Sequence, residues 1–375
     1  MPSRFTQAGW RWLAPCVVRL KACSDRLMRL LTVGSLFVLA ACTSAGSAGM
    51  APSQSTSASP AAAPKVRIST WTSPQGHVHE VAIWRPAALA PAGAHEGPGA
   101  EAMRTGIERV YVVPGSGCTG MAPILPGYFE GLAAREFIVL HKHHVQASDW
   151  PRPSPCRAGF VEHDELAAWL RAWRAFLTQD LRERPVPHGR VLLVGISEGA
   201  ELLPGLMAEV PDLGMAVLLA STGLDPWEAL RLQLKREGDL GFAQAVEARL
   251  AESMPALDGT QADSAASPNG SPLLGGRTLN HWRTLRHWPV AQPLQESQVR
   301  ALVLLGSADP VQAPEGLERL AHQHSRPGLC ARLVAGADHG LRVEGHQWPG
   351  MWPLVQGLWQ AEGQQAFARR CAQPD

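Results

Sequence analysis

Short apolar runs alternate with longer segments of helical periodicity along this chain, a pattern typical of a mostly parallel sheet flanked by helices. The apolar runs of strand length are 109–113, 137–140, 191–194, 213–220, 300–305 and 331–334. From Asp164 onward, apolar side chains recur three and four positions apart, which predicts a long helix. Two alternating segments, 66–71 and 77–84, flank a turn signal and predict an antiparallel strand pair at one edge of the sheet.

The regular succession of strands and helices is interrupted between 224 and 297. This interval contains two helical patterns, a loop-like piece and a segment rich in Trp, His and Arg, at 226–235, 242–254, 259–276 and 279–288. We therefore predict an α/β fold in which 224–297 forms a helical cap over a site. Further helices are expected at 198–210, with a kink at Pro204, at 314–323 and at 352–371.

Length and charge limit the classes of function. The chain has 375 residues, of which 45% are hydrophobic and 18% charged, which suits one large α/β domain with an insertion. Beyond position 41 there are 28 basic and 32 acidic residues, a net charge of −4. A mildly acidic body lacks the basic surface that nucleic-acid binding requires, so we expect no nucleic-acid partner.

The N-terminal residues predict a targeting segment. A basic region that ends at Arg29 precedes the apolar stretch 30–41, which is too short to span a bilayer. The four residues 39–42 read Leu-Ala-Ala-Cys, which resembles the lipobox of bacterial lipoproteins. The resemblance implies a signal peptide at 1–41 and a lipid on Cys42; the alternative is an ordinary secretory signal.

This resemblance also implies a location. The lipid on Cys42 would hold the protein on the periplasmic side of the cell envelope. The residue after the cysteine is Thr43, and the absence of an Asp at this position favours the outer membrane. Residues 42–64 are rich in Ser, Ala, Pro and Gly and predict a flexible tether to a folded domain at 65–375.

Four cysteines remain in the predicted domain: Cys118, Cys156, Cys330 and Cys371. An even number in an oxidising compartment suggests two disulfides, for which three pairings exist. We favour Cys118–Cys156 with Cys330–Cys371, because each pair flanks neighbouring elements; four buried thiols are the alternative.

The central motif is G-x-S-x-G at 195–199, directly after the apolar run 191–194. The chain must turn sharply there from strand to helix, with Ser197 at the apex of the turn in a strained backbone conformation. Small residues two positions before and after the serine keep the strand and helix from clashing. Ser197 is therefore the candidate nucleophile, although a plain turn serine would fit the same five residues.

A glycine-rich loop follows the strand at 109–113. The backbone N–H groups of Gly115, Ser116 and Gly117, together with that of Glu198, are candidates to bind a developing oxyanion. A phosphate-binding loop is the weaker interpretation, because no G-K-[ST] follows.

Asp309 and His339 each follow a later predicted strand, so both should lie at the carboxyl edge of the sheet near Ser197. His339 would act as general base and Asp309 would orient it. Asp309 could instead cap the next helix, and His339 could be a loop residue, but the order Ser–Asp–His favours a triad. Asp225 is an alternative acid, and Asp338 is expected to point away from the imidazole.

Three histidines within four residues, His141, His143 and His144, raise the question of a metal. No carboxylate or further histidine follows at ligand spacing, and the chain contains no C-x-x-C. We therefore expect a polar strand end, with no metal site and no cofactor.

Residues 66–375 resemble the α/β-hydrolase superfamily. The resemblance rests on the G-x-S-x-G turn at 195–199, the sequence GSADP around Asp309 and the sequence GADHG around His339. Residues 195–200, with Pro204 beyond, are similar to a variant found in dienelactone-hydrolase-like and serine-peptidase-like members, although Ile196 and Ala200 depart from it. The resemblance implies a serine hydrolase acting on an ester or related acyl compound. A peptidase with a short peptide substrate, or a non-catalytic binding lipoprotein on the same scaffold, are the alternatives.

Overall fold

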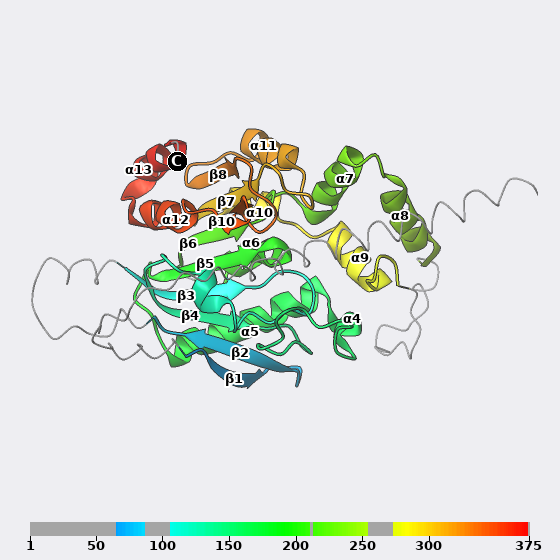
Figure 1. Ribbon diagram of the computed structural model, residues 1–375, viewed down its shortest axis with the longest axis horizontal. Coiled ribbons are helices and arrows are strands. Elements are labelled where there is room, and N and C mark those ends of the chain that lie inside the picture. The colour runs from blue at the N-terminus through cyan, green and yellow to red at the C-terminus, as the bar shows by residue number, and fades with distance from the viewer. Residues whose placement is uncertain (1–64, 87–105, 211–212, 254–272, 374–375) are drawn as a thin grey trace, which may run out of the picture.

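A computed structural model of the chain describes residues 65–86, 106–210, 213–253 and 273–373; the expected signal peptide, Cys42 and tether lie outside these residues. An eight-stranded sheet with the order β1-β2-β4-β3-β5-β6-β7-β8 forms the centre (Figure 1). Its strands are β1 (Arg67–Thr72), β2 (Val78–Trp84), β3 (Ile107–Val113), β4 (Ala134–Leu140), β5 (Val191–Ile196), β6 (Leu213–Leu219), β7 (Arg300–Gly306) and β8 (Leu329–Val334). A short antiparallel pair, β9 (Arg342–Val343) and β10 (His346–Gln347), lies apart from it.

The pairing of the strands explains their sequence patterns. β1 and β2 pair antiparallel at one edge, as the alternating segments predicted, and β2 is also antiparallel to β4. All strands from β4 to β8 in the sheet order run parallel. Parallel strands have both faces covered, which is why β5 is almost wholly apolar.

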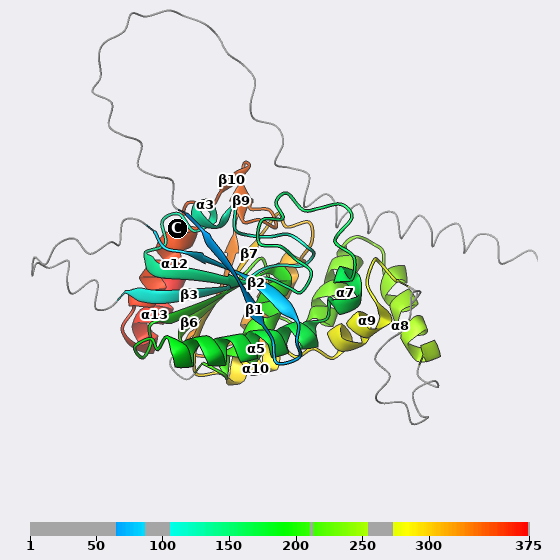
Figure 2. The same ribbon diagram turned by 90° about the horizontal axis from the view of Figure 1, so that it is seen from below.

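Helices cover both faces of the sheet. One apolar layer packs α5 (Leu166–Glu183), α6 (Leu203–Met207), α10 (Ala291–Glu296) and α11 (Pro314–Gln323) against one face (Figure 2). The opposite face carries α3 (Leu125–Tyr128), α12 (Met351–Gln360) and α13 (Gly363–Ala372). The one-turn helix α4 (Phe160–His163) lies just before α5.

The interval predicted as a cap contains a small core of its own. Helices α7 (Pro226–Arg236), α8 (Gly241–Ser253) and α9 (Leu279–Arg286) project beyond the sheet in Figures 1 and 2. Their core includes Trp227, Phe242 and Trp282. Helix α10, which the prediction also assigned to this interval, packs instead in the layer against the sheet.

Two predicted helices are interrupted in the structure. The segment 198–210 starts as a 3₁₀ helix, η2 (Ser197–Leu202), and continues as α6, so that Pro204 lies in a first turn rather than at a kink. A proline fits there because the first N–H groups of a helix have no partner in the helix. The segment 352–371 divides into α12 and α13, where Gly363 takes the left-handed φ of +77°.

Both predicted disulfides form, with the predicted pairing. Cys118–Cys156 joins the glycine-rich loop to the loop before α4, and Cys330–Cys371 joins β8 to α13. The two cysteines of each pair are 38 and 41 positions apart in the sequence, respectively.

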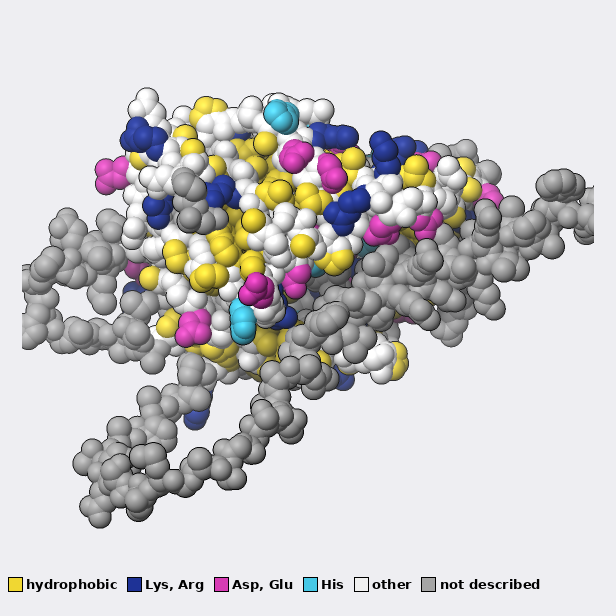
Figure 3. All heavy atoms as spheres, turned by 45° about the horizontal axis from the view of Figure 1, so that its top comes forward, with side chains coloured by type: hydrophobic (Ala, Val, Ile, Leu, Met, Phe, Trp, Pro, Cys, Tyr) yellow, Lys and Arg dark blue, Asp and Glu magenta, His cyan; other side chains and the backbone are white. Residues whose placement is uncertain are grey.

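The face shown in Figure 3 carries charges of both signs. Among the described residues visible in Figure 3, basic and acidic side chains are interspersed. In the same part of the chain, every helix is too short or too polar to cross a bilayer.

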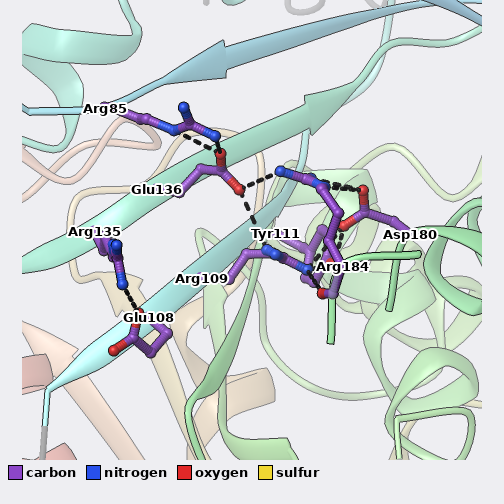
Figure 4. Close-up of polar contacts among 8 residues, drawn as sticks. All are labelled: Arg85, Glu108, Arg109, Tyr111, Arg135, Glu136, Asp180 and Arg184. Carbon is purple, nitrogen blue, oxygen red and sulfur yellow. Dashed lines mark hydrogen bonds and ion pairs between the residues drawn. The ribbon is translucent and has the colours of Figure 1, made fainter. Parts of the chain in front are cut away.

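A buried ion cluster ties β3, β4 and α5 together (Figure 4). The Glu136 carboxylate, whose side chain is 6% exposed, pairs with Arg85 at 2.6 Å, Arg184 at 2.8 Å and Arg109 at 3.3 Å. Arg109 and Arg184 also pair with Asp180. Burial alone would raise the pKa of Glu136, but the hydrogen bond from Arg85 and the charges of the three arginines outweigh it and lower this pKa.

Replacing Glu136 by Gln is expected to lower the free energy of unfolding by about 3 kcal/mol, because the buried Arg109 loses a charge partner. Urea denaturation followed by circular dichroism measures the loss. Glu108→Gln is the matched control, since the Glu108–Arg135 pair lies at the surface and should contribute less than about 1 kcal/mol. Equal losses in the two variants would contradict this assignment.

The lowered pKa of Glu136 also predicts how the stability difference between wild type and Glu136→Gln depends on pH. A carboxyl with a lowered pKa stabilises the fold above its unfolded pKa of about 4.3. That contribution disappears as the pH falls through the pKa of folded Glu136. The stability difference between wild type and Glu136→Gln should therefore be full at neutral pH and shrink below about pH 4.3.

Candidate active site

The turn from β5 into η2 presents Ser197 at the carboxyl edge of the sheet. Ser197 has a φ of +53°, in the left-handed region that costs energy for a residue with a side chain. A Cβ on Gly199 would lie 2.2 Å from the Val113 carbonyl oxygen, and one on Gly195 would lie 2.6 Å from the Ala200 Cα. The G-x-S-x-G pattern is therefore required by contact between β5, η2 and the end of β3.

His339 connects the serine to an aspartate. The His339 Nε2 lies 2.9 Å from the Ser197 Oγ, and its Nδ1 lies 2.7 Å from the Asp309 Oδ2. With Nδ1–H donating to the carboxylate, Nε2 is left as an acceptor for the serine hydroxyl. The structure thus brings together the three residues that the sequence placed after separate strands.

The Asp309 carboxylate is fixed in its orientation. Its Oδ1 accepts the N–H groups of Val311 at 2.7 Å and Gln312 at 2.9 Å, and its side chain is fully buried. The loop that carries it touches the histidine loop at Gly306, where a Cβ would lie 2.1 Å from the Ala337 carbonyl oxygen. The histidine and the aspartate are therefore positioned by the same contact.

The two other acids considered from the sequence have other partners. The Asp225 Oδ1 accepts the N–H groups of Val290 at 2.7 Å and Ala291 at 3.0 Å, at the start of α10. The Asp338 Oδ1 accepts N–H groups within its own loop, from Gly340 and Arg342. Asp309 is the acid that meets His339, and Asp225 acts as a helix cap.

The glycine-rich loop lies over the serine. A Cβ on Gly115 would lie 3.5 Å from the Ser197 Cβ and 3.3 Å from the Ile196 carbonyl oxygen. Ser116 is exposed, and Gly117 has a left-handed φ of +86°. Glu198 is the second residue of η2 and lies in its first turn, where N–H groups have no partner within the helix. The loop and the helix start are thus both close enough to Ser197 to supply donors.

A buried ion network that the sequence analysis missed adjoins the serine. Lys142, directly after β4, pairs with Asp164 at 2.6 Å and also with the Glu198 carboxylate. Arg277, from the cap interval, contacts both carboxylates, Glu198 at 3.3 Å and Asp164. Two cations and two anions balance, and all but Arg277 are less than 10% exposed.

Charge and burial decide the ionisation of this network. Burial raises the pKa of Glu198, but the neighbouring Lys142 charge more than reverses that effect, and the net pKa is lowered. Burial lowers the pKa of Lys142 to about 8. Glu201, one turn further along, has its pKa raised well above the usual range by burial and by the charge of Glu198.

The cap interval also contacts the acid loop. Arg236 of α7 donates to the Asp309 carbonyl oxygen at 2.5 Å, and Gln233 donates to that of Pro310 at 2.8 Å. Sequence patterns could not reveal these contacts, because each joins segments more than 70 positions apart.

The histidine run divides between core and surface. His141 is fully buried, with Nε2 accepting the Met121 N–H at 3.0 Å and Nδ1 beside the Glu80 carbonyl oxygen. His143 and His144 turn outward, and His163 of α4 comes beside them; one ring nitrogen of each of these three lies within 4.8 Å of the others. No further histidine follows the run at ligand spacing in the sequence, but α4 brings His163 beside it from 19 positions away.

Comparison with known proteins gives matches in structure but not in sequence. No protein-family model and no curated protein matches the chain. A hypothetical protein from Pseudomonas aeruginosa superposes with a TM-score of 0.51 at 13% identity, over 80% of this chain and 94% of that one.

Two further structures match less well. Puromycin hydrolase gives a TM-score of 0.47 at 16% identity, over 81% of this chain, which spans only 40% of that protein. A Pyrococcus furiosus esterase gives 0.48 at 11% identity, over 80% of this chain and 92% of the esterase.

The topology of the chain itself identifies the fold. The sheet is parallel from β4 to β8, and β2 runs antiparallel beside it. The serine turn follows β5, and the loops that carry Asp309 and His339 follow β7 and β8, which is the order of an α/β-hydrolase triad. The chain has the α/β-hydrolase fold.

Proposed function

We propose that this chain is a serine hydrolase that cleaves an ester or a related acyl bond. The observation that carries the proposal is the continuous path of hydrogen bonds from Asp309 through His339 to the Ser197 hydroxyl. A non-catalytic binding role would not require a serine in a strained conformation beside a correctly oriented histidine. The triad thus favours an enzyme over a binding scaffold.

The geometry supports a two-step reaction. His339 Nε2 takes the Ser197 proton as Oγ attacks the acyl carbon, and the resulting oxyanion is stabilised by N–H groups of Glu198 and of the 115–117 loop. His339 then gives the proton to the leaving alkoxide, which departs and leaves an acyl-enzyme. A water, activated by the same nitrogen, attacks that ester and releases the acid and free Ser197.

The ion network bears on the choice between ester and peptide substrates. Glu198 follows the nucleophile and would be suited to bind a substrate amine if its carboxylate were free. Both of its oxygens already face cations, Lys142 on one side and Arg277 on the other. This arrangement favours an acyl substrate without a required free amine, and amide hydrolysis becomes an outcome of the test.

The cellular location is part of the proposal. We infer a lipid on Cys42 that anchors the domain at the periplasmic side of the envelope, from the residues 39–42 and the tether that follows. Two disulfides in the domain fit an oxidising compartment.

A fluorophosphonate probe tests the catalytic claim. The wild-type protein should be labelled on Ser197, because only an activated serine reacts with such a probe. Labelling should vanish in Ser197→Ala and persist in Ser148→Ala, an exposed serine away from the triad. The proposal is contradicted if folded wild-type protein takes up no label.

Hydrolysis rates measured on acyl esters of graded chain length and on aminoacyl amides then rank the substrate classes.

The two acids are separated by matched substitutions. Asp309→Asn should lower kcat by about 10⁴, because the asparagine holds His339 in the wrong tautomer. Asp225→Asn should leave kcat within a few-fold and cost less than about 1 kcal/mol of stability, since asparagine also caps helices. Steady-state ester hydrolysis and urea denaturation give both numbers. A larger loss of kcat in Asp225→Asn would contradict the assignment.

Anchoring is tested by cell fractionation. Cys42→Ala should move the protein from the membrane fraction to the soluble one, because the lipid attachment atom is removed. Cys23→Ala is the control and should stay with the membrane. If the two variants partition alike, Cys42 is not the anchor.

A further inference from the structure

Three histidines that do not belong to the catalytic triad form a cluster of their own. His143 and His144 lie in the turn after β4, and His163 lies at the end of α4. One ring nitrogen of each lies within 4.8 Å of the other two. Zinc–nitrogen distances of about 2.0–2.1 Å place tetrahedral nitrogens roughly 3.3 Å apart, so small side-chain rotations would bring all three onto one ion.

The backbone orients two of the rings. The His143 Nδ1 lies 2.9 Å from the Val78 carbonyl oxygen, and the His163 Nδ1 lies 2.7 Å from that of Gly159. Each ring therefore donates Nδ1–H to a carbonyl and keeps a lone pair on Nε2. Histidines that bind metals show this second hydrogen bond almost always, because it fixes both the tautomer and the direction of the ring.

The third histidine, His144, has a strained backbone and a ring that packs closely against Gly159. His144 has a left-handed φ of +65°, and its Nε2 is buried without a hydrogen-bond partner among the described residues. A Cβ on Gly159 would lie 2.8 Å from that nitrogen, so the glycine makes room for the ring.

A cavity of about 220 Å³ adjoins two of the three histidines. Its lining includes His77, His143, His163 and Glu162. The His77 ring is stacked on that of His143, with centroids 4.7 Å apart and planes 9° from parallel. Stacked in this way, His77 packs beside the cluster and lines the same cavity as His143 and His163.

We propose that His143, His144 and His163 bind one divalent transition-metal ion of the zinc, copper and nickel class. Three imidazoles without a carboxylate suit these borderline ions and not calcium or magnesium, which take oxygen ligands. The ion would join the turn after β4 to α4.

The placement gives the ion a structural role. Lys142 precedes His143 and Asp164 follows His163, and these two residues form the 2.6 Å ion pair of the network beside Ser197. The metal and the ion pair would therefore connect the same two segments at adjacent positions. The inference does not depend on the reaction proposed above.

Metal binding is measured on the full chain, purified in detergent without a histidine tag and stripped by a chelator. Zn²⁺ added in competition with a chromophoric chelator should bind with one equivalent per chain and raise the melting temperature. Co²⁺ should give the visible absorption of a site rich in nitrogen ligands. His163→Ala should weaken Zn²⁺ binding at least tenfold, whereas His346→Ala, an exposed histidine on β10, should leave it unchanged.

A second measurement needs no variant and so does not depend on how a variant folds. Zn²⁺ should protect His143, His144 and His163 of wild-type protein from acylation by diethyl pyrocarbonate, as mapped by mass spectrometry, and leave His346 reactive. Absence of a stoichiometric site, or equal modification of the three histidines with and without Zn²⁺, would overturn the proposal. Loss of fluorophosphonate labelling with intact Zn²⁺ binding would count against the hydrolase alone.

Discussion

The contact between η2 and the end of β3 is the constraint on which the site depends. No side chain fits at Gly199, because the Val113 carbonyl oxygen occupies the place of a Cβ. This approach lets the chain reverse directly after β5 and holds Ser197 in a left-handed conformation. The energy that this conformation costs is offset by the packing of β5, whose first five residues are all buried.

Two other loops reach the serine from the same edge of the sheet. Parallel strands end together, so residues that follow β7 and β8 arrive beside those that follow β5. A glycine again permits the closest approach, at Gly306 against the Ala337 carbonyl oxygen. Preorganisation of this kind places His339 before substrate binds, which is how such a site lowers an activation barrier.

The network around Lys142 joins the site to the cap interval. Arg277 reaches the Glu198 carboxylate beside the nucleophile, while Arg236 of α7 supports the Asp309 loop. Buried ion networks contribute little net stability compared with apolar packing, but they fix geometry, since breaking one partner leaves an uncompensated charge. The cap interval is therefore linked electrostatically to two of the three loops that form the triad.

The sequence by itself predicted where the apolar strands lie, offered Ser197, Asp309 and His339 as a candidate triad and favoured the cysteine pairing that the structure shows, because each depends on local periodicity or on residues placed next to strands. The order of the strands in the sheet came from the tertiary structure. The division of 352–371 into two helices was not predicted, although Gly363, where α13 begins, lies in the largely polar stretch 360–365. Only the tertiary structure brought Lys142 to Glu198 and His163 to His143, because folding alone makes neighbours of residues so far apart in the chain.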